Sequence, residues 1–368
     1  MRNTFLKLSK MLILGERDVM RALDLTECLT VNRKAYLSLV DQRGVVPTRL
    51  GLPYPNNPTD SQTKRTTEAT LATTTEAQDW TLIKPAAYYD DAHAESNNST
   101  VIMGLKVVSI RAENPSRGLP LVPATILLVN SMTGIVEATL GGTYLTTART
   151  SAGPALAVQT FQPNCQELVI FGAGSQAECH IQLMELALGR SIPKITIINR
   201  SQERAEALRA KISSRTKTDV IVLHDQQAVI QALSTADVVS ATTNSPTPLW
   251  EDGSVLKKGC LITGIGSYTP DMQEIPPSAV DRSFVIIDTP EAMEVGDLKH
   301  LRETPSETRH HPITLMGNAL ANPASIIERG MDCIFYKAVG TAIQDVLTAE
   351  IVVNKARALG IGQEIDMS

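Results

Sequence analysis

Ten consecutive residues, Leu168-Val169-Ile170-Phe171-Gly172-Ala173-Gly174-Ser175-Gln176-Ala177, combine an apolar run, a glycine turn and the start of a helical pattern. Gly172 permits the tight turn, Gly174 lets the backbone approach a pyrophosphate, and Ala177 lets helix and strand pack closely. The free N–H groups at the start of the helix then attract phosphate. The pattern therefore predicts dinucleotide binding by Gly172, Ala173, Gly174, Ser175, Gln176 and Ala177.

The chain around this turn has two kinds of pattern. After residue 167, short apolar runs alternate with helical stretches, which predicts a Rossmann-type doubly wound parallel sheet over residues 146–334. Before it, strand-like runs at 80–83, 101–110 and 125–130 follow one another without helices, as in a mixed sheet. Residues 340–359 read as one amphipathic helix that packs back on the first domain. We therefore expect an α+β domain formed by residues 11–145 and 335–368.

Composition limits the kind of partner. The 368 residues carry a net charge of −5 without a Lys/Arg cluster, which argues against nucleic acid and anionic membranes. No apolar run is long enough to span a bilayer, and the five scattered cysteines suit buried thiols in a reducing compartment. We expect a soluble cytoplasmic protein with an exposed Thr-rich loop at 59–78. The residues before Met11 are interpreted as an N-terminal extension, with a targeting peptide as the alternative.

The end of the second Rossmann strand indicates the cofactor. An NAD enzyme usually places Asp or Glu there to bind the ribose hydroxyls. This chain instead has Asn199, Arg200 and Ser201, with Arg204 one turn further on. A guanidinium can pair with a 2′-phosphate, so these residues favour NADPH over NADH, although NADH remains possible. A solvated helix start with Ser201 as its N-cap explains the same residues and is compatible with either cofactor.

Three basic residues of the first part of the chain stand among apolar or small residues, namely Arg49, Lys106 and Arg149. Lys106 interrupts a run that otherwise reads as a buried strand, and a buried lysine is costly unless it is paired. Two arginines and a lysine suit a small carboxylate substrate. Solvated side chains on an exposed face are the alternative for each of the three.

Histidines give no sign of a metal site. His180 and His224 are interpreted as structural, and the pair His310-His311 as a solvated loop, since no third ligand stands nearby in the sequence. We expect no bound metal.

Together these segments resemble the ornithine cyclodeaminase/mu-crystallin family, over most of the chain from Met11 onward. The matching stretches are Gly104-Leu105-Lys106-Val107-Val108, Thr146-Thr147-Ala148-Arg149-Thr150, the glycine turn, and Lys337-Ala338-Val339-Gly340-Thr341-Ala342. The resemblance implies that Arg49, Lys106 and Arg149 surround the substrate carboxylate and the reacting carbon. It also implies a homodimer formed through the first domain, and a nicotinamide side lined by Thr242, Thr243, Gly266 and Val339.

One loop separates the activities within that family. Members that deaminate ornithine carry G-x-D-x-P-G-K after the fifth strand, whereas this chain has Gly266-Ser267-Tyr268-Thr269-Pro270-Asp271-Met272. Tyr268 occupies the Asp position, so the loop is more similar to that of the ketimine reductase and Δ1-pyrroline-2-carboxylate reductase members. The N-R-S stretch at 199–201 agrees with this assignment.

The resemblance thus implies NADPH-dependent reduction of a cyclic ketimine carboxylate, with Lys106 and Arg149 as catalytic residues. Lys106 can either donate a proton or bind the carboxylate, and the sequence does not separate these roles. Three alternatives remain: an ornithine cyclodeaminase-type lyase, an amino-acid dehydrogenase with bound NAD, and a non-catalytic NADPH-binding protein like the crystallin branch.

Overall fold

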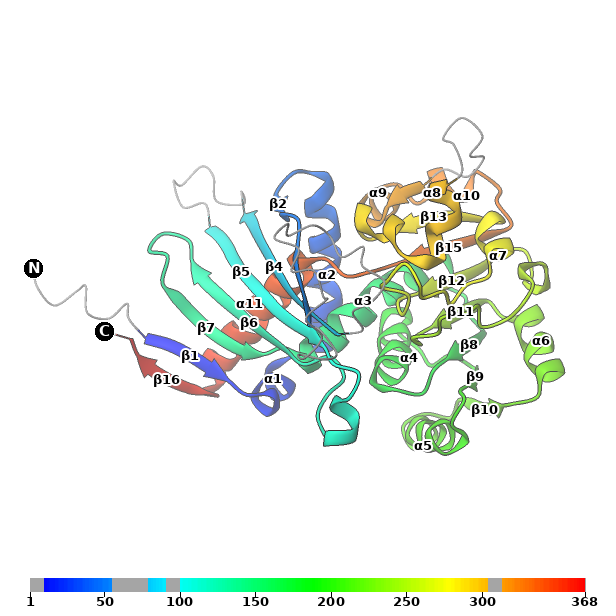
Figure 1. Ribbon diagram of the computed structural model, residues 1–368, viewed down its shortest axis with the longest axis horizontal. Helices are drawn as coiled ribbons and strands as arrows, with labels where there is room; N and C mark the ends of the chain where they lie inside the picture. The colour runs from blue at the N-terminus through cyan, green and yellow to red at the C-terminus, as the bar shows by residue number, and fades with distance from the viewer. Residues whose placement is uncertain (1–9, 55–78, 91–99, 304–312, 368) are drawn as a thin grey trace, which may run out of the picture. The chain divides into compact units, whose positions relative to one another are not determined.

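The computed structural model describes residues 10–54, 79–90, 100–303 and 313–367, shown as the coloured ribbon in Figure 1. Three expectations concern residues outside these ranges: the N-terminal extension up to residue 9, the Thr-rich loop 59–78 and the His310-His311 pair.

The chain divides into two compact units. Unit 1 comprises residues up to Arg149 and from Thr341 onward, and unit 2 comprises Thr150–Gly340. The sequence placed residues 335–340 in the first domain. They belong to unit 2, because residues 333–337 form a strand that pairs on both sides with strands of the parallel sheet. Residues 146–149, expected in the Rossmann domain, belong to unit 1.

Unit 1 contains a mixed sheet of eight described strands in the order β16-β1-β7-β6-β5-β4-β2, with β3 also paired to β4. Only the β1–β7 pairing is parallel in this part of the structure. The elements are β1 (Lys10–Leu14), α1 (Glu16–Ala22), α2 (Leu25–Val40), β2 (Gly44–Val45), β3 (Leu50–Tyr54), β4 (Asp79–Asp90), β5 (Thr100–Ile110), the 3-10 helix η3 (Asn114–Arg117), β6 (Ala124–Asn130), β7 (Val136–Gly141), the first part of α3 (Thr143–Phe161), α11 (Ala342–Leu359) and β16 (Gln363–Asp366).

The alternation of buried and partly exposed residues along the central strands identifies the covered face of this sheet. Along residues 84–88 of β4 and 104–108 of β5, buried residues alternate with partly exposed ones. Helix α11 packs across β4, β5 and β6 with α2 beside it (Figure 1). Side chains alternate between the faces of a strand, so the buried set shares the helix-covered face. Its members are apolar with two exceptions, Lys84 on β4 and Lys106 on β5. The C-terminal helix therefore packs on the first domain, as the sequence predicted.

Unit 2 contains an eight-stranded parallel sheet in the order β10-β9-β8-β11-β12-β15-β13-β14, which confirms the predicted Rossmann-type fold. The elements are the second part of α3, β8 (Glu167–Phe171), α4 (Ser175–Leu188), β9 (Lys194–Ile198), α5 (Gln202–Ser213), β10 (Asp219–Leu223), α6 (Gln226–Thr235), β11 (Val238–Ala241), η4 (Gly253–Val255), β12 (Cys260–Gly264), α7 (Pro277–Asp281), β13 (Ser283–Ile287), η5 (Pro290–Glu294), η6 (Gly296–Leu298), α8 (Lys299–Glu303), β14 (Ile313–Leu315), α9 (Met316–Ala321), α10 (Ala324–Ile327) and β15 (Cys333–Lys337).

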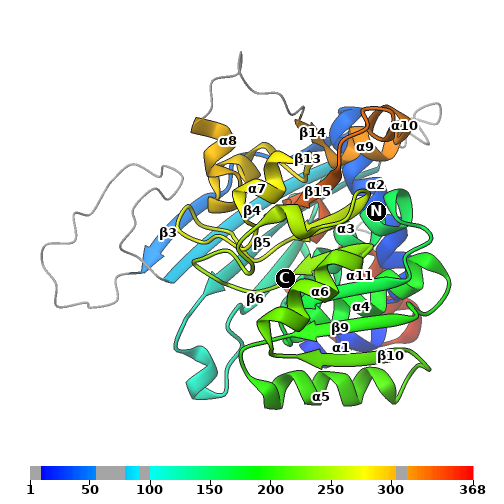
Figure 2. The same ribbon diagram turned by 90° about the vertical axis from the view of Figure 1, so that its right-hand side faces the viewer.

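The strand order of unit 2 reverses between β8 and β11, which is where open α/β sheets bind their ligands. Strands β8, β11, β12 and β13 are buried almost throughout, as expected of a parallel sheet covered on both faces. Side-chain caps begin the flanking helices, Ser201 for α5 and Asp225 for α6. Figure 2 shows α5 running alongside β10 at one edge of this sheet.

Within the described ranges, none of the helices combines the length and the apolar character needed to cross a membrane.

Candidate active site

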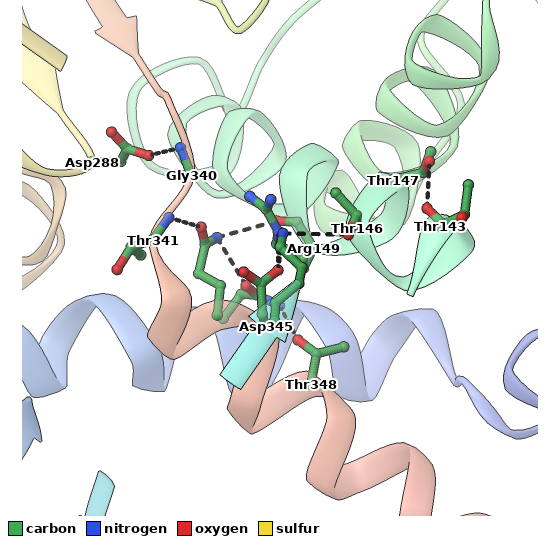
Figure 3. Close-up of polar contacts among 12 residues, drawn as sticks. Thr143, Thr146, Thr147, Arg149, Asp288, Gly340, Thr341, Asp345 and Thr348 are labelled. Atoms are coloured by element: carbon green, nitrogen blue, oxygen red, sulfur yellow. Dashed lines mark hydrogen bonds and ion pairs between the residues drawn. The ribbon is translucent and has the colours of Figure 1, made fainter. Parts of the chain in front are cut away.

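Two of the three predicted basic residues meet at one buried carboxylate in unit 1. Lys106 Nζ and Arg149 Nε each donate to Oδ1 of Asp345, at 2.7 Å in both cases, and Lys106 Nζ lies 3.4 Å from Thr146 Oγ1. The Asp345 side chain is fully buried, and those of Lys106 and Arg149 are nearly so. Figure 3 shows Arg149, from α3, and Asp345, from α11, pointing toward each other. Lys106, Arg149 and Asp345 form what we call the Asp345 cluster.

A second lysine lies beside the Asp345 cluster. Lys84 on β4 pairs in register with Lys106 on β5, so the two side chains leave the sheet side by side on the covered face. Like charges directly opposite each other destabilise a sheet. Burial, and then the charge of Lys106, lower the pKa of Lys84 well below its usual value. Two buried lysines side by side destabilise the folded state. Buried groups with strongly shifted pKa values are common at functional sites.

The electrostatics of the Asp345 cluster set the charge of Lys106. Burial lowers the pKa of Lys106 to about 7, with the charges of Arg149 and Arg49 adding to the effect and Asp345 opposing it. Burial alone raises the pKa of Asp345, but the charges of Arg149, Lys106 and Lys84 outweigh it and hold that pKa below its usual value. Asp345 is therefore ionised at neutral pH, and Lys106 can gain or lose a proton there.

The third predicted residue, Arg49, lies between β2 and β3 and is partly buried. It is close enough to Lys84 and Lys106 for its charge to lower the pKa of both lysines, although burial and nearer charges act more strongly on each. The structure thus brings all three predicted substrate residues together in unit 1, and adds Lys84 and Asp345.

This arrangement suits an anionic ligand. Four basic side chains and one carboxylate lie close enough to influence one another's charge in the described part of unit 1, and most of them are buried. A carboxylate ligand would bring compensating negative charge and accept the remaining N–H groups of the guanidinium fork.

The glycine turn of unit 2 fits a dinucleotide. Gly172 has φ of +109°, and a Cβ there would come within 2.5 Å of Thr242 Oγ1, so the turn needs glycine. A Cβ at Gly174 would meet no atom within 4 Å, so the backbone is open to a ligand there. Helix α4 begins at Ser175, and Gly174 is its N-cap residue. The first N–H groups of a helix have no intrahelical partner and can bind phosphate.

The residues expected to choose the cofactor follow β9, which pairs with β8 next to the glycine turn. Asn199 Nδ2 donates to the backbone oxygen of Ser201 at 2.8 Å, and Ser201 Oγ accepts from the Arg204 N–H at 3.3 Å as the N-cap of α5. Both Arg200 and Arg204 are exposed. Ser201 therefore caps α5, and the guanidinium groups of Arg200 and Arg204 are accessible to a phosphate.

Loops after β11 and β12 carry the residues expected on the nicotinamide side, and Glu274 joins these loops. Glu274 Oε1 accepts from the Thr243 N–H at 2.6 Å, and its Oε2 accepts from the Gly266 N–H at 2.7 Å. Gly266 packs so closely on Thr243 that a Cβ would lie 1.5 Å from its backbone oxygen. Burial raises the pKa of Glu274, while Lys337 and the hydrogen bonds of Thr243 act against the rise.

Val339 follows β15 at the same edge of the parallel sheet, where Asp288 accepts from the N–H groups of Val339 and Gly340. Thr242 Oγ1 donates to the Phe171 backbone oxygen at 2.8 Å, directly before the glycine turn. Unit 2 therefore places the predicted residues Thr242, Thr243, Gly266 and Val339 around the ends of β8, β11, β12 and β15.

Tyr268 lies in the loop after β12 and is partly buried. No group of three or more His, Cys, Asp or Glu side chains suitable for a metal occurs within the described ranges.

Sequence reasoning missed Lys84, Asp345 and Glu274. Lys84 carries the same signal as Lys106, a basic residue inside a strand-like apolar run, Leu82-Ile83-Lys84-Pro85-Ala86. Asp345 occupies a buried position of the C-terminal helix next to Val346. Its partners lie 196 and 239 residues away along the chain, beyond the range of any local pattern.

Comparison with known proteins gives consistent results. A sequence profile of the ornithine cyclodeaminase/mu-crystallin family matches residues 93–360. A Δ1-pyrroline-2-carboxylate reductase from Bacillus cereus is 27% identical over 97% of this chain and 100% of its own length.

Two solved structures share the fold. The Δ1-pyrroline-2-carboxylate reductase of Thermococcus litoralis in complex with NADH and L-proline has a TM-score of 0.80 and 22% identity, covering 96% of this chain and 100% of its own. An archaeal alanine dehydrogenase dimer with bound NAD has a TM-score of 0.80 and 21% identity, covering 98% and 100%. Because the family profile matches most of its length, the chain belongs to the ornithine cyclodeaminase/mu-crystallin family.

Proposed function

We propose that this protein uses NADPH to reduce a cyclic ketimine that carries a carboxylate, Δ1-pyrroline-2-carboxylate or the six-membered Δ1-piperideine-2-carboxylate, to the cyclic amino acid. The observation that carries the proposal is the Asp345 cluster, in which Lys106 and Arg149 are held on one buried carboxylate beside Lys84. Clustered basic side chains of this kind suit a small carboxylate substrate. The glycine turn of unit 2 supplies the dinucleotide site. The names of the Bacillus and Thermococcus relatives agree with this assignment.

In the proposed reaction, Arg49 and Arg149 bind the substrate carboxylate and orient the ring. A guanidinium binds a carboxylate through two parallel N–H groups, which fixes direction as well as position. Thr242, Thr243, Gly266 and Val339 line the nicotinamide side, where buried hydrogen bonds of Glu274 and Asp288 fix the backbone. Holding the two reactants in a defined geometry is a large part of what an enzyme must supply for such a step.

Lys106 supplies the proton. Its pKa of about 7, lowered by burial, lets it give a proton to the imine nitrogen at neutral pH and regain one from water. The reduced nicotinamide, when bound, supplies the hydride that the imine carbon receives. One proton and one hydride thus convert the C=N bond to CH–NH, without any need for a carboxylate base at residue 268.

Tyr268 separates this reaction from ornithine deamination. A phenol is protonated at neutral pH, so it can donate a hydrogen bond but cannot replace a carboxylate as a base. Purified protein should therefore oxidise NADPH with the five- or six-membered imine and release no ammonia from ornithine with NAD. Ammonia release at a comparable rate would favour the lyase, and NAD-dependent oxidation of alanine without imine reduction would favour a dehydrogenase. NADPH binding without turnover of any substrate would favour a non-catalytic protein.

The preference for NADPH is proposed to depend on Arg200. Loss of a charge-assisted contact to the 2′-phosphate costs about 1.5–3 kcal/mol. Arg200→Ala should therefore raise the Michaelis constant for NADPH at least about tenfold and leave that for NADH nearly unchanged. Steady-state kinetics with each cofactor would measure both constants.

A matched control for Arg200 is Arg209→Ala in the helix that follows it, because Arg209 is exposed and pairs with Glu206. This variant should change neither Michaelis constant. Equal effects of Arg200→Ala on NADPH and NADH would remove the basis for the NADPH assignment.

We also propose a homodimer formed through the face of the unit 1 sheet away from α11. A hollow of about 270 Å³ lies on it, with an almost wholly apolar lining that includes Val45, Pro85, Met103, Leu105 and Val129. The archaeal alanine dehydrogenase of the same fold is described as a dimer. Sedimentation velocity should give the mass of two chains, and a monomer at micromolar concentration would count against the dimer.

The proposed location is the cytoplasm, whose reducing environment keeps thiols reduced. All five cysteines are buried.

A further inference from the structure

We propose that Asp345 is a positioning residue, which fixes Lys106 and Arg149 in their working orientation and keeps Lys106 in its ammonium form until the substrate arrives. The inference rests on the proposed function and extends it to a residue that does not itself bind the substrate.

The geometry of the pairing is unusual for a simple ion pair. Lys106 and Arg149 both donate to the same oxygen, Oδ1, whereas Oδ2 has no hydrogen-bond partner among the described residues. Because one oxygen holds both cations, two charged groups that would otherwise repel are kept next to each other, one from β5 and one from α3. The carboxylate therefore determines the relative position of the two groups.

Hydrogen bonds of the neighbouring residue hold the helical turn that carries Asp345. It lies in the first turn of α11, where the helix dipole stabilises a negative charge. The neighbouring Gln344 Nε2 donates to Asn32 Oδ1 and Tyr36 OH, both at 2.9 Å, and to the Arg149 backbone oxygen at 3.1 Å. This turn of α11 is thereby tied to α2 and to α3, the helix that carries Arg149 (Figure 3).

The charged groups around Lys106 come from four segments of unit 1. Lys84 comes from β4, Arg49 from the segment between β2 and β3, Arg149 from α3 and Asp345 from α11; its register partner on β6, Ile126, is apolar. Within the described ranges, Asp345 is the only acidic partner of Lys106. Burial and the arginine charges lower the pKa of Lys106 to about 7, and Asp345 is what opposes them.

Replacing Asp345 with a neutral group should therefore release the proton of Lys106. The sign is fixed: a lower pKa of Lys106 means that its ammonium form is lost at a lower pH. If catalysis needs that form, the fall of kcat/KM on the alkaline side should move toward acid in Asp345→Asn. A purely structural role for Asp345 would lower activity at every pH without moving this limb.

The decisive experiment is a pH titration of the Lys106 side chain by NMR in ligand-free protein with 13C- and 15N-labelled lysine. Lys106→Met assigns the signal. The Lys106 pKa should lie near 7 in the wild type. It should fall by at least about one unit in Asp345→Asn, as loss of a directly paired charge requires. Thr348→Val is the control, because Thr348 is also buried on α11 but accepts a hydrogen bond from Asn32. In the Thr348→Val variant, the Lys106 signal should titrate as in the wild type.

An unchanged Lys106 pKa in folded Asp345→Asn overturns the inference. If Asp345→Asn does not fold, Asp345→Glu decides, since it keeps the charge but moves the carboxylate by one methylene. Fixed geometry then predicts at least about a tenfold loss of kcat/KM for the imine, and wild-type turnover in Asp345→Glu would overturn the positioning role. The NMR titration needs no substrate, so a lowered pKa in a protein that reduces no imine would leave the role of Asp345 standing and refute only the proposed function.

Discussion

Arg149→Lys is expected to lower kcat/KM for imine reduction by about 100-fold or more, with an unaltered far-UV circular dichroism spectrum. Arg149 Nε donates to Asp345 Oδ1 at 2.7 Å. The remaining N–H groups of the planar guanidinium can then bind a substrate carboxylate. Lysine keeps the charge but has no fork, so it cannot hold Asp345 and bind a carboxylate through parallel N–H groups at once. A 100-fold loss corresponds to about 2.7 kcal/mol of transition-state stabilisation.

The matched control is Arg117→Lys. Arg117 is an exposed arginine of unit 1 that pairs with Glu113 four residues away, and such pairs contribute little. Its replacement should leave kcat/KM within about twofold. Near-normal activity of Arg149→Lys would show that Arg149 only helps to hold unit 1 together, and the carboxylate-binding role would have to be given up.

The largest expected effect on stability is that of Asp297→Ala in unit 2. Asp297 Oδ2 pairs with Lys337 Nζ at 2.9 Å, with both side chains fully buried, and its Oδ1 accepts the N–H groups of Glu274 and Ile275. Removing the carboxylate leaves a buried cation and two buried N–H groups without their acceptor. Breaking a buried ion pair in this way should lower the free energy of unfolding by about 3–5 kcal/mol, which urea denaturation followed by tryptophan fluorescence would measure.

Two comparisons make the Asp297 result specific. Asp281→Ala removes an exposed partner of His300 and should change the free energy of unfolding by less than about 0.5 kcal/mol. The double variant Asp297→Ala/Lys337→Met removes both charges and should recover part of the loss, because no cation is then left unpaired. A loss below about 1 kcal/mol in Asp297→Ala would mean that the Lys337 charge finds water or another partner.

The sequence predicted the Rossmann-type unit well because its signals are local. The turn Gly172-Ala173-Gly174 follows its strand directly, and the structure requires glycine at residue 172 for conformation and space. The alternation of apolar runs and helices likewise identified most strands of the parallel sheet. It did not reveal that β15 enters this sheet between β12 and β13, because the pairing joins segments about 50 to 70 residues apart.

The candidate site was predictable in part for the same reason. Lys106 is recognisable because a lysine interrupts an apolar strand, and Lys84 carries the same signal. The acidic member could not be found this way. Asp345 looks like one polar residue of an amphipathic helix until the fold brings that helix onto β5 and α3. Charge pairing across such distances depends on tertiary structure, and so does the pKa of Lys106.

Transfer of deuterium from NADPH to the product would show whether this protein reduces a cyclic imine. Wild-type protein would be incubated with Δ1-pyrroline-2-carboxylate and, in separate samples, with NADPH deuterated on one or the other face of nicotinamide C4, and the product examined by mass spectrometry and NMR. One of the two samples should yield proline with a single deuterium at C2, and the other should yield unlabelled proline. The six-membered imine is the parallel substrate. Failure of both imines to give a labelled amino acid, in protein shown to bind NADPH, would rule out the proposed imine reduction.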